Sequence, residues 1–510
     1  METSISTFTE KIASYTAEDR ERIAAALRWA EQDSMNHILG VAAILVDLNM
    51  DVDTIIAAAL QKGLEKGALS GEAIAENFGA GAALLAQGIA RIADISAKNK
   101  TNHEAENIRK MLFAMVSDIR VILIKLADKL YGMRTLDLAG QGDRKVVTQE
   151  CLDIYAPLAD RLGISWMKDE LEDLSLKHLN REVFIQIKDM VAQKRGERRD
   201  FLGKIRETIM AEAKAAGIAV TVESRAKHFY SIYQKMRKRN KTVEDIYDLL
   251  GIRVICDSID DCYNLLGLAH RLWKPLDGRF KDYIAMHKAN GYQSLHTTVM
   301  CSLAQSSGEE EAPEGRLLEI QIRTWEMHRI AEYGVASHWL YKKGGPPRSV
   351  SPGEISIVNR LRDWKQAERS EGSSESFLED IKRELLKDSI YVFTPQGKVI
   401  ELPVGSTAID FAYSIHSAVG NHCSGAKANG NIIPLSMELQ NTQVVEILTA
   451  TNARPHVNWL RFVKTSRARN RIRSWLQEND DSLIIEKNVI AKKKTAALEP
   501  VRAVPPPEKE

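Results

Sequence analysis

The chain of 510 residues is poor in cysteine, has almost no net charge and lacks long apolar runs. Its five cysteines show neither CxxC spacing nor a Cys/His zinc pattern, which argues against a disulfide framework or a zinc finger. Lys and Arg number 70 against 69 Asp and Glu, so no field of the whole chain draws it to nucleic acid or a membrane. No apolar run approaches the roughly 18 residues that span a bilayer, and the first residues show no signal-peptide pattern. We therefore expect a cytoplasmic protein with buried, reduced thiols and no membrane partner.

Hydrophobic residues make up 44% of the chain, enough for several cores in a chain too long for one. Residues 1–165 repeat apolar positions at helical spacing, as in DTIIAAALQKGLEK, and predict an all-α domain. Residues 166–370 alternate helical patterns with β-branched runs such as LLGIRVICDS, which predicts an α/β domain with flanking helices. Residues 386–450 combine short strands and turn dipeptides, typical of a small β-rich module. Residues 451–510 hold a basic helical segment and a charged, Pro-rich tail that we expect to be mobile.

The middle third begins with a crowd of cations on a helical segment, RAKHFYSIYQKMRKRN. Fixed positive charge of this kind suits triphosphate oxygens, which Arg can hold bidentately. A solvated helix face is the other explanation of such a run. The cations are Arg225, Lys227, Lys235, Arg237, Lys238 and Arg239.

Two carboxylates stand on strand-like runs of the same third. Asp248 opens the apolar run that carries Arg253, where a half-buried carboxylate needs either Mg²⁺ or an internal Arg partner. In LEIQIR, the polar residues Glu319, Gln321 and Arg323 alternate with apolar ones and so share one face of a strand. Together, Asp248 and Glu319 could hold Mg²⁺ and draw the proton from an attacking hydroxyl. That is the minimal equipment for in-line phosphoryl or pyrophosphoryl transfer.

Between these strands, a turn and an aromatic ring follow further cations. Asn290 and Gly291 supply a tight turn, and Tyr292 follows at once, so a base could stack there beside phosphate-binding charge. An ordinary core aromatic would explain Tyr292, and a hydrogen-bonded strand histidine would explain His296, without any ligand. The cations are Arg279, Lys281 and Lys288.

Taken together, these clusters resemble the synthetase domain of the RelA/SpoT (Rel) family of alarmone, (p)ppGpp, synthetases and hydrolases. The resemblance implies a GTP/GDP 3′-diphosphokinase that acts in the stringent response and transfers pyrophosphate from ATP to the 3′-hydroxyl of GDP or GTP. It implies that Asp248 and Glu319 are catalytic and hold Mg²⁺. The residues implied for ATP are Arg225, Lys227, Lys235, Arg253, Arg279 and Lys281, with the arginines 225 and 253 around adenine. Those implied for the acceptor guanine nucleotide are Lys288, Asn290, Tyr292, His296 and Gln321, with the tyrosine stacked on guanine.

The helical third is similar to the family's HD-type metal-dependent hydrolase, with departures at its metal site. The positions that match the metal ligands are His37, Gln61, Lys62 and Asp128. Gln61 is a poor substitute for imidazole, and Lys62 puts an ammonium where a carboxylate should face a divalent cation. We therefore predict a degenerate domain without hydrolase activity and without Mn²⁺. His37 and Asp128 are better explained as capped or paired polar residues of a helical core.

Residues 386–450 resemble the TGS module of the long family members, a β-grasp-like fold, over most of YVFTPQGKVIELPVGSTAIDFAYSIHSAVGNHCSGAKANG. In ribosome-associated members this module reads the 3′ end of an uncharged tRNA, which implies His416 as an RNA contact and tRNA and the ribosome as partners. The basic helix that follows, with Trp459 and Trp475, is the concentrated candidate for an RNA-facing surface. A solvated amphipathic helix is the alternative.

The sequence thus predicts a multidomain (p)ppGpp synthetase that has lost its hydrolase activity. The alternative is a protein of another class, in which both catalytic domains are scaffolds and the TGS module binds RNA or the ribosome. The retained Asp248, Glu319 and Tyr292 favour the enzyme, because a decayed synthetase should have lost some of them.

Overall fold

The computed structural model forms two compact units, Met1–Leu378 and Glu379–Glu510, each with its own hydrophobic clusters. It describes residues 5–93, 118–138, 141–193, 195–225, 227–239, 250–286, 288, 290–301, 315–337 and 389–479. The five cysteines are all free and buried, as predicted. Within the described residues, no helix is long and apolar enough to cross a membrane. Asp248 and the tail predicted to be mobile lie outside the described residues, and the predicted domain boundaries stay predictions.

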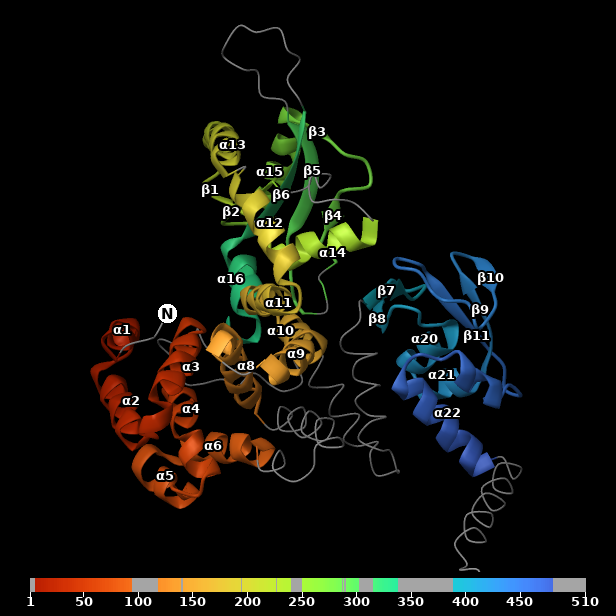
Figure 1. Cartoon of the computed structure of the whole chain (residues 1–510). Coiled ribbons are helices and arrows are strands. Elements are labelled where there is room, and N and C mark those ends of the chain that lie inside the picture. Colours follow the sequence, from red (N-terminus) through yellow and green to blue (C-terminus); the bar gives the residue numbers. More distant parts are fainter. Residues whose placement is uncertain are drawn as a thin grey trace, which may run out of the picture. The chain divides into compact units, whose positions relative to one another are not determined.

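The first unit begins with an all-α domain, as predicted (Figure 1). Its helices bury apolar stripes against one another, as α4 does with Ile55, Ile56 and Leu60. They are α1 (Ile5–Lys11), α2 (Ala17–Trp29), α3 (Met35–Asp47), α4 (Val52–Glu65), α5 (Gly71–Phe78), α6 (Ala80–Ala93), α8 (Arg120–Arg134), α9 (Gln141–Glu150) and α10 (Ala156–Arg161).

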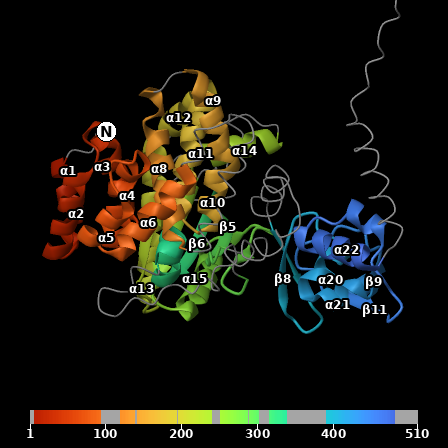
Figure 2. The same ribbon diagram turned by 90° about the horizontal axis from the view of Figure 1, so that it is seen from below.

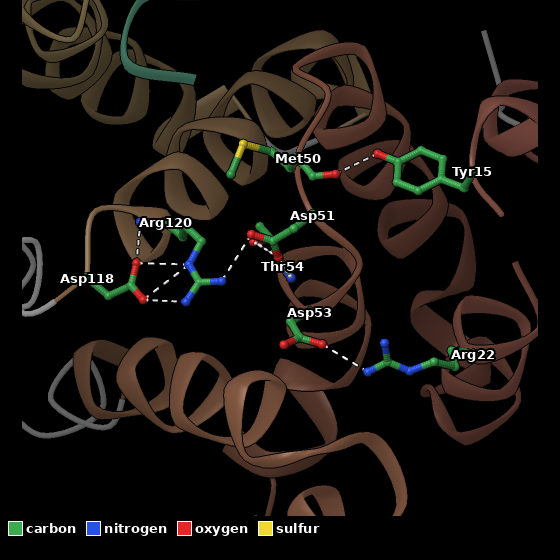
Figure 3. A network of polar contacts seen from close by, with 8 residues as sticks. All are labelled: Tyr15, Arg22, Met50, Asp51, Asp53, Thr54, Asp118 and Arg120. Carbon is green, nitrogen blue, oxygen red and sulfur yellow. Dashed lines mark hydrogen bonds and ion pairs between the residues drawn. The ribbon is translucent and has the colours of Figure 1, made fainter. Parts of the chain in front are cut away.

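A network of ion pairs fixes the start of α4, the helix that also carries residues 61 and 62 (Figure 3). Asp51 caps the helix and accepts a hydrogen bond of 3.0 Å from Arg120 Nη1, while Arg120 also binds Asp118 at 2.7 Å. On the other side, Arg22 Nη2 donates to Asp53 Oδ1 at 2.9 Å. These contacts hold α4 between α2 and α8.

Three long helices lead from the α-helical domain to the sheet: α11 (Ser165–Leu179), α12 (Arg181–Gln193) and α13 (Arg195–Ala215). A small cluster of buried side chains, Leu176, Ile187 and Ile232, packs α11 and α12 against α14 (Phe229–Arg239). The helix α14 therefore rests on the connecting helices, as Figure 1 also shows.

The α/β domain is built on a six-stranded sheet, which confirms the predicted fold class. The strand order is β1-β2-β6-β5-β3, β4 pairs with β5, and β2 and β6 are parallel while the other pairs are antiparallel. One face packs on α13 and α15 (Ile259–Leu272) through a core that includes Leu318, Ile320 and Ile322. The helix α16 (Trp325–Tyr333) follows β6 directly. The strands are β1 (Thr221–Ser224), β2 (Leu250–Cys256), β3 (Lys274–Pro275), β4 (Lys281–Asp282), β5 (Leu295–Cys301) and β6 (Arg316–Thr324).

The second unit is the small β-rich module that the sequence predicts (Figure 2). A three-stranded sheet, in the order β10-β9-β11, and the pair β7–β8 surround α20 (Ala408–Ile415). Its other elements are α21 (Ser417–Asn421), β7 (Ser389–Phe393), β8 (Val399–Pro403), β9 (Cys423–Ala428), β10 (Asn431–Ile433), β11 (Val445–Thr449) and α22 (Ser466–Asn479).

The basic helix α22 packs against this module and shares a core with it. Ile472 and Leu476 lie in one cluster with Ile409 and Tyr413 of α20, and the same cluster holds Trp459. Trp459 is only 9% exposed, so its ring is not part of the RNA-facing surface for which the sequence made it a candidate. An apolar stripe at helical spacing gains more from burial against α20 than from exposure to solvent.

Candidate functional site

One row of cross-strand neighbours crosses the polar face of the sheet. Lys281 of β4 pairs with His296 of β5, His296 with Gln321 of β6, and Gln321 with Arg253 of β2. Directly paired residues project from the same face of a sheet, so these four side chains form a line. The strand register thus brings together residues that the sequence assigned to two different nucleotides.

Three side chains converge on Glu319, which lies on the same face of β6 as Gln321. Lys227 Nζ is 3.1 Å from Oε2, Gln321 Nε2 donates to Oε1 at 3.0 Å, and His296 Nδ1 lies 3.6 Å from Oε1. Burial alone would raise the pKa of Glu319, but the charge of Lys227 and the hydrogen bond from Gln321 outweigh it and lower the pKa to about 2. Glu319 is therefore an ionised carboxylate.

His296 and Tyr292 form a neutral pair beside this carboxylate. Burial lowers the pKa of His296 to about 3, although the charge of Glu319 opposes that shift. Burial also raises the pKa of Tyr292, and its Oη lies 2.7 Å from His296 Nε2. A protonated phenol facing a neutral imidazole is a good hydrogen-bond donor to it, so the histidine is oriented toward Glu319.

Lys288 lies over the aromatic rings of Tyr283 and Tyr292. Its Nζ is 4.9 Å from the centre of the Tyr283 ring and 5.2 Å from that of Tyr292, and the two rings meet edge to face. Tyr292 is half-buried, and its ring presents a face to a cation. The predicted stacking of Tyr292 on guanine stays a prediction.

Asn290 is engaged in two structural contacts. Its Nδ2 donates to the carbonyl oxygen of Asp160 in α10 at 2.9 Å, and its Oδ1 accepts from the amide of Tyr292 at 3.2 Å. Asn290, which the sequence predicts to bind the acceptor nucleotide, therefore also links the turn before Tyr292 to the α-helical domain. Gly291 takes a φ of +76°, which a residue with a side chain rarely adopts, as the predicted tight turn requires.

Arg225 and Arg253 lie on neighbouring segments, and their predicted contacts with adenine stay a prediction. The amide of Arg225 donates to the carbonyl oxygen of Gly251 at 2.8 Å, and a Cβ on Gly251 would meet that of Arg225 at 3.6 Å and its carbonyl oxygen at 3.2 Å. Arg253, two residues along β2, lies 3.1 Å from Glu332 Oε1 in α16. Arg279 and Lys281 are exposed, and Lys235 is half-buried on α14.

Sequence reasoning missed Glu332 and His328. Glu332 Oε1 also lies 3.2 Å from Arg323 Nη2, and His328 Nδ1 is 2.8 Å from the same nitrogen. Arg323 is 1% exposed, and these two residues of α16 both contact Nη2 of its buried guanidinium, whereas Nε has no hydrogen-bond partner among the described residues. His328 and Glu332 are one helical turn apart on α16, the helix that follows β6, and this spacing was the sequence signal that could have shown that they lie on one face.

Glu319 suits Mg²⁺, a hard cation that prefers carboxylate oxygens, because it is ionised and only partly buried. In the structure, Lys227 Nζ lies 3.1 Å from Glu319 Oε2, where an ammonium occupies one side of the carboxylate. The second predicted ligand, Asp248, lies outside the described residues.

Of the four positions of the α-helical domain that match the metal ligands, His37 and Asp128 are in contact, and the residues present do not fit a divalent metal. His37 Nε2 lies 2.6 Å from Asp128 Oδ1, so each is a paired polar residue, with the other as its partner. Burial would raise the pKa of Asp128, but His37, Lys125 and Lys62 lower it. Gln61 is 3% exposed, and its Oε1 lacks a hydrogen-bond partner in the part of the chain that the structure describes. The charge of Lys62 thus acts on Asp128, the carboxylate among these four positions.

His416 caps α21 in the second unit. The side chain is exposed, and its Nδ1 accepts a hydrogen bond from the amide of Ala418 at 3.2 Å. That contact fixes the ring at the start of the helix, and the RNA contact stays a prediction.

Three matches to known protein families define the class of protein. Family models described as "HD domain", "Region found in RelA / SpoT proteins" and "TGS domain" match residues 13–165, 224–346 and 390–449. This order of domains is that of a multidomain HD–RelA/SpoT–TGS protein.

Relatives from three bacteria then identify the family. The guanosine-3′,5′-bis(diphosphate) 3′-pyrophosphohydrolase of Aquifex aeolicus is 40% identical over 92% of this chain and 67% of the relative. The bifunctional (p)ppGpp synthase/hydrolase SpoT of Escherichia coli is 41% identical over 89% and 63%, and the GTP pyrophosphokinase of Myxococcus xanthus 41% identical over 89% and 58%. The chain therefore belongs to the RelA/SpoT family, and it spans about three fifths to two thirds of the length of these relatives.

Proposed function

We propose that this chain is a GTP/GDP 3′-diphosphokinase that makes (p)ppGpp and that its HD domain does not hydrolyse the product. The observation that carries the synthetase half is the convergence of Lys227, Gln321 and His296 on the ionised Glu319. Two of the relatives are named for synthesis of this product or for GTP pyrophosphokinase activity, which agrees with the proposal.

In the reaction, the 3′-oxygen of GDP or GTP attacks the β-phosphorus of ATP, the bond from that phosphorus to the oxygen of the α-phosphate breaks, and AMP leaves. The 3′-hydroxyl proton passes to Glu319. Lys227 keeps the pKa of Glu319 at about 2 against the opposing effect of burial, which makes the carboxylate a weak base. ATP phosphates would compete for Lys227, and the pKa of Glu319 would then rise toward its ordinary value. Glu319 would thus become a better base once ATP is bound.

The cations near the row would receive the phosphates of ATP. Arg279 and Lys281 are exposed on the segment that includes β4, and Lys281 is the register neighbour of His296. Glu319 and Asp248 are the residues that would hold Mg²⁺, which supplies neutralisation of the phosphate charge. His296, kept neutral, would orient Glu319 without competing for the proton.

The test is transfer of label from γ-labelled ATP to GDP or GTP in the presence of Mg²⁺. Labelled guanosine tetra- or pentaphosphate is the expected product. Absence of transfer, including with uncharged tRNA and ribosomes added, would overturn the synthetase half.

The proposed loss of hydrolase activity rests on Gln61 and Lys62. An amide and an ammonium replace an imidazole and a carboxylate, and the ammonium acts on Asp128. Some relatives are named as hydrolases, so the direct test is incubation of purified alarmone with the chain and Mn²⁺. Intact alarmone is expected, and released pyrophosphate would contradict the proposal.

A second candidate function is RNA or ribosome binding through the TGS module, without catalysis. The exposed His416 favours it, whereas the burial of Trp459 removes one of the aromatic rings on which it depended. Binding of uncharged tRNA that His416→Ala abolishes, in a chain that transfers no label, would favour this alternative.

A further inference from the structure

The segment that carries Arg225 and Lys227 is followed by a histidine held between two carboxylates. His228 Nε2 lies 2.9 Å from Asp169 Oδ2, and its Nδ1 lies 3.4 Å from Asp173 Oδ2. Both aspartates belong to α11, one of the connecting helices. The histidine therefore joins the nucleotide segment to a helix outside the sheet.

The two aspartates are arranged to receive this contact. Asp169 and Asp173 are four residues apart on α11, so they lie on one face of the helix and repel one another unless a cation lies between them. Asp173 also accepts, through Oδ1, a hydrogen bond of 2.8 Å from the amide of Tyr230. That contact satisfies an amide in the first turn of α14, which begins directly after His228.

The start of α14 is thus anchored on α11 through His228 and the amide of Tyr230, and the helix itself packs there. Ile232 lies in the small core with Leu176 of α11 and Ile187 of α12. Lys227, one residue before His228, must then reach from this anchored segment to Glu319 on β6. A displacement of the segment would move the ammonium away from the carboxylate.

We propose that His228 is a positioning residue, whose contacts with Asp169 and Asp173 hold the preceding segment where Lys227 can reach both Glu319 and the ATP phosphates. The inference deepens the proposed function and rests on it for the identity of the nucleotide.

The chemistry of imidazole fits this role. Only the imidazolium donates from both ring nitrogens, and two carboxylates on opposite sides require two donors. Burial alone would lower the pKa of His228, but the hydrogen bonds and charges of Asp169 and Asp173 raise it to about 9. The ring is therefore charged at neutral pH, and its own positive charge lies on α11 and not in the site.

The test compares His228→Gln, Asp169→Asn and Asp173→Asn with Lys177→Ala in the full chain. Lys177→Ala removes a different ion pair of α11, with Asp137, and is the matched control. In the first three variants, the KM for ATP is expected to rise about tenfold, because a small displacement of a residue that contacts the substrate weakens the interaction strongly. The KM for GDP is expected to change less than twofold, and the control is expected to match the wild type.

Two further measurements separate this inference from the proposed function. Amide exchange of residues 229–239, without nucleotide, is expected to be faster in His228→Gln than in the wild type. Calorimetry with a non-hydrolysable ATP analogue is expected to show the same loss of affinity. If the wild type transfers no label but the exchange and affinity differences are present, only the proposed function fails. Unchanged exchange and unchanged ATP affinity in His228→Gln, or an equal rise in both KM values, would overturn the inference.

Discussion

The Glu319 carboxylate is surrounded by an ammonium, an amide and an imidazole. A substitution by glutamine removes its charge and keeps its shape. We expect Glu319→Gln to lower the rate of pyrophosphate transfer by about 10²–10⁴-fold, because the isosteric amide cannot accept the 3′-hydroxyl proton. The measurement is single-turnover transfer at saturating ATP. Glu326→Gln in the first turn of α16 is the control, and we expect it to leave the rate unchanged. A loss of less than tenfold in Glu319→Gln would argue against Glu319 as the base.

The exchange of two residues should restore metal binding to the α-helical domain. Gln61→His combined with Lys62→Asp would add an imidazole and a carboxylate next to the His37–Asp128 pair. We expect Mn²⁺ to raise the melting temperature of this double variant and not that of the wild type, since a ligand at 100 times its Kd stabilises by about 2.7 kcal/mol. An equal shift in the wild type would show that Gln61 and Lys62 do not block a metal.

His228 should make stability fall with pH in a defined window. Its pKa is raised from 6.5 to about 9 in the folded chain, so its charged contacts stabilise fully below pH 6.5 and are lost as the pH rises to about 9. The melting temperature of the wild type minus that of His228→Gln should therefore shrink across this window. Glu172, whose pKa burial raises to about 7, titrates nearby, and taking the difference between the two proteins removes its effect. A difference that stays constant from pH 6.5 to 9 would contradict the assignment of charge.

Single residues were predictable where a local pattern determines the side-chain direction. The alternation in LEIQIR correctly placed Glu319, Gln321 and Arg323 on one face, because a strand has a period of two. The contact of His228 with Asp169 and Asp173 was not predictable, because it joins a loop to a distant helix and no local spacing encodes it.

At the scale of elements, Asp410 holds together two helices of the second unit. It is 1% exposed and accepts from the amides of Thr407, Lys464 and Thr465 at 2.8, 3.0 and 2.8 Å. We expect Asp410→Ala to destabilise this unit by about 3 kcal/mol, because several buried amides lose their acceptor together. Denaturant unfolding of the whole chain, followed by amide exchange in α20 and α22, measures the effect.

Glu446→Ala provides the comparison, because Glu446 forms an exposed ion pair with Lys427 on the same module. A change below about 0.5 kcal/mol is expected there. Equal losses in the two variants would mean that Asp410 has no special role.

The type of each element was easier to predict than its packing. The helix α22 was expected, and its many arginines suggested a surface for RNA. Ile472 and Leu476, one turn apart, instead pack it against α20. The direction in which an amphipathic helix turns its apolar stripe depends on which surface is available nearby, and the sequence alone does not contain that information.

At the scale of the molecule, the first unit joins its helical and α/β domains through two glycines. Gly163 lies in the turn before α11, Gly334 ends α16, and a Cβ on Gly334 would lie 2.0 Å from the carbonyl oxygen of Leu162. The amide of Val335 donates to that same oxygen at 2.9 Å. The contact therefore depends on the absence of a side chain.

We expect Gly334→Ala to separate these segments and to lower the stability of the first unit by at least about 2 kcal/mol more than Gly278→Ala does. Gly278 also has a positive φ, +69°, but nothing within 4 Å of its would-be Cβ, so it controls for backbone strain alone. Thermal unfolding measures the difference. Similar melting temperatures for the two variants would show that the close approach is not required.

The order of domains was predictable from the resemblance, whereas the contact between them was not. Asn290 was assigned to the acceptor nucleotide, yet its side chain also bridges to Asp160 of the α-helical domain. A motif that marks a ligand contact cannot by itself reveal a second, structural use of the same side chain.

The ammonium of Lys62 is attached to the chain by covalent bonds, unlike the ion that it would replace. Its charge helps to keep Asp128 ionised at a distance set by the fold, and it has no dissociation constant. Under this proposal, the α-helical domain cannot lose its cation to a chelator or to a competing metalloprotein. Its shape would then be the same in metal-poor and metal-rich cells, so any influence that it has on synthesis is independent of the supply of manganese.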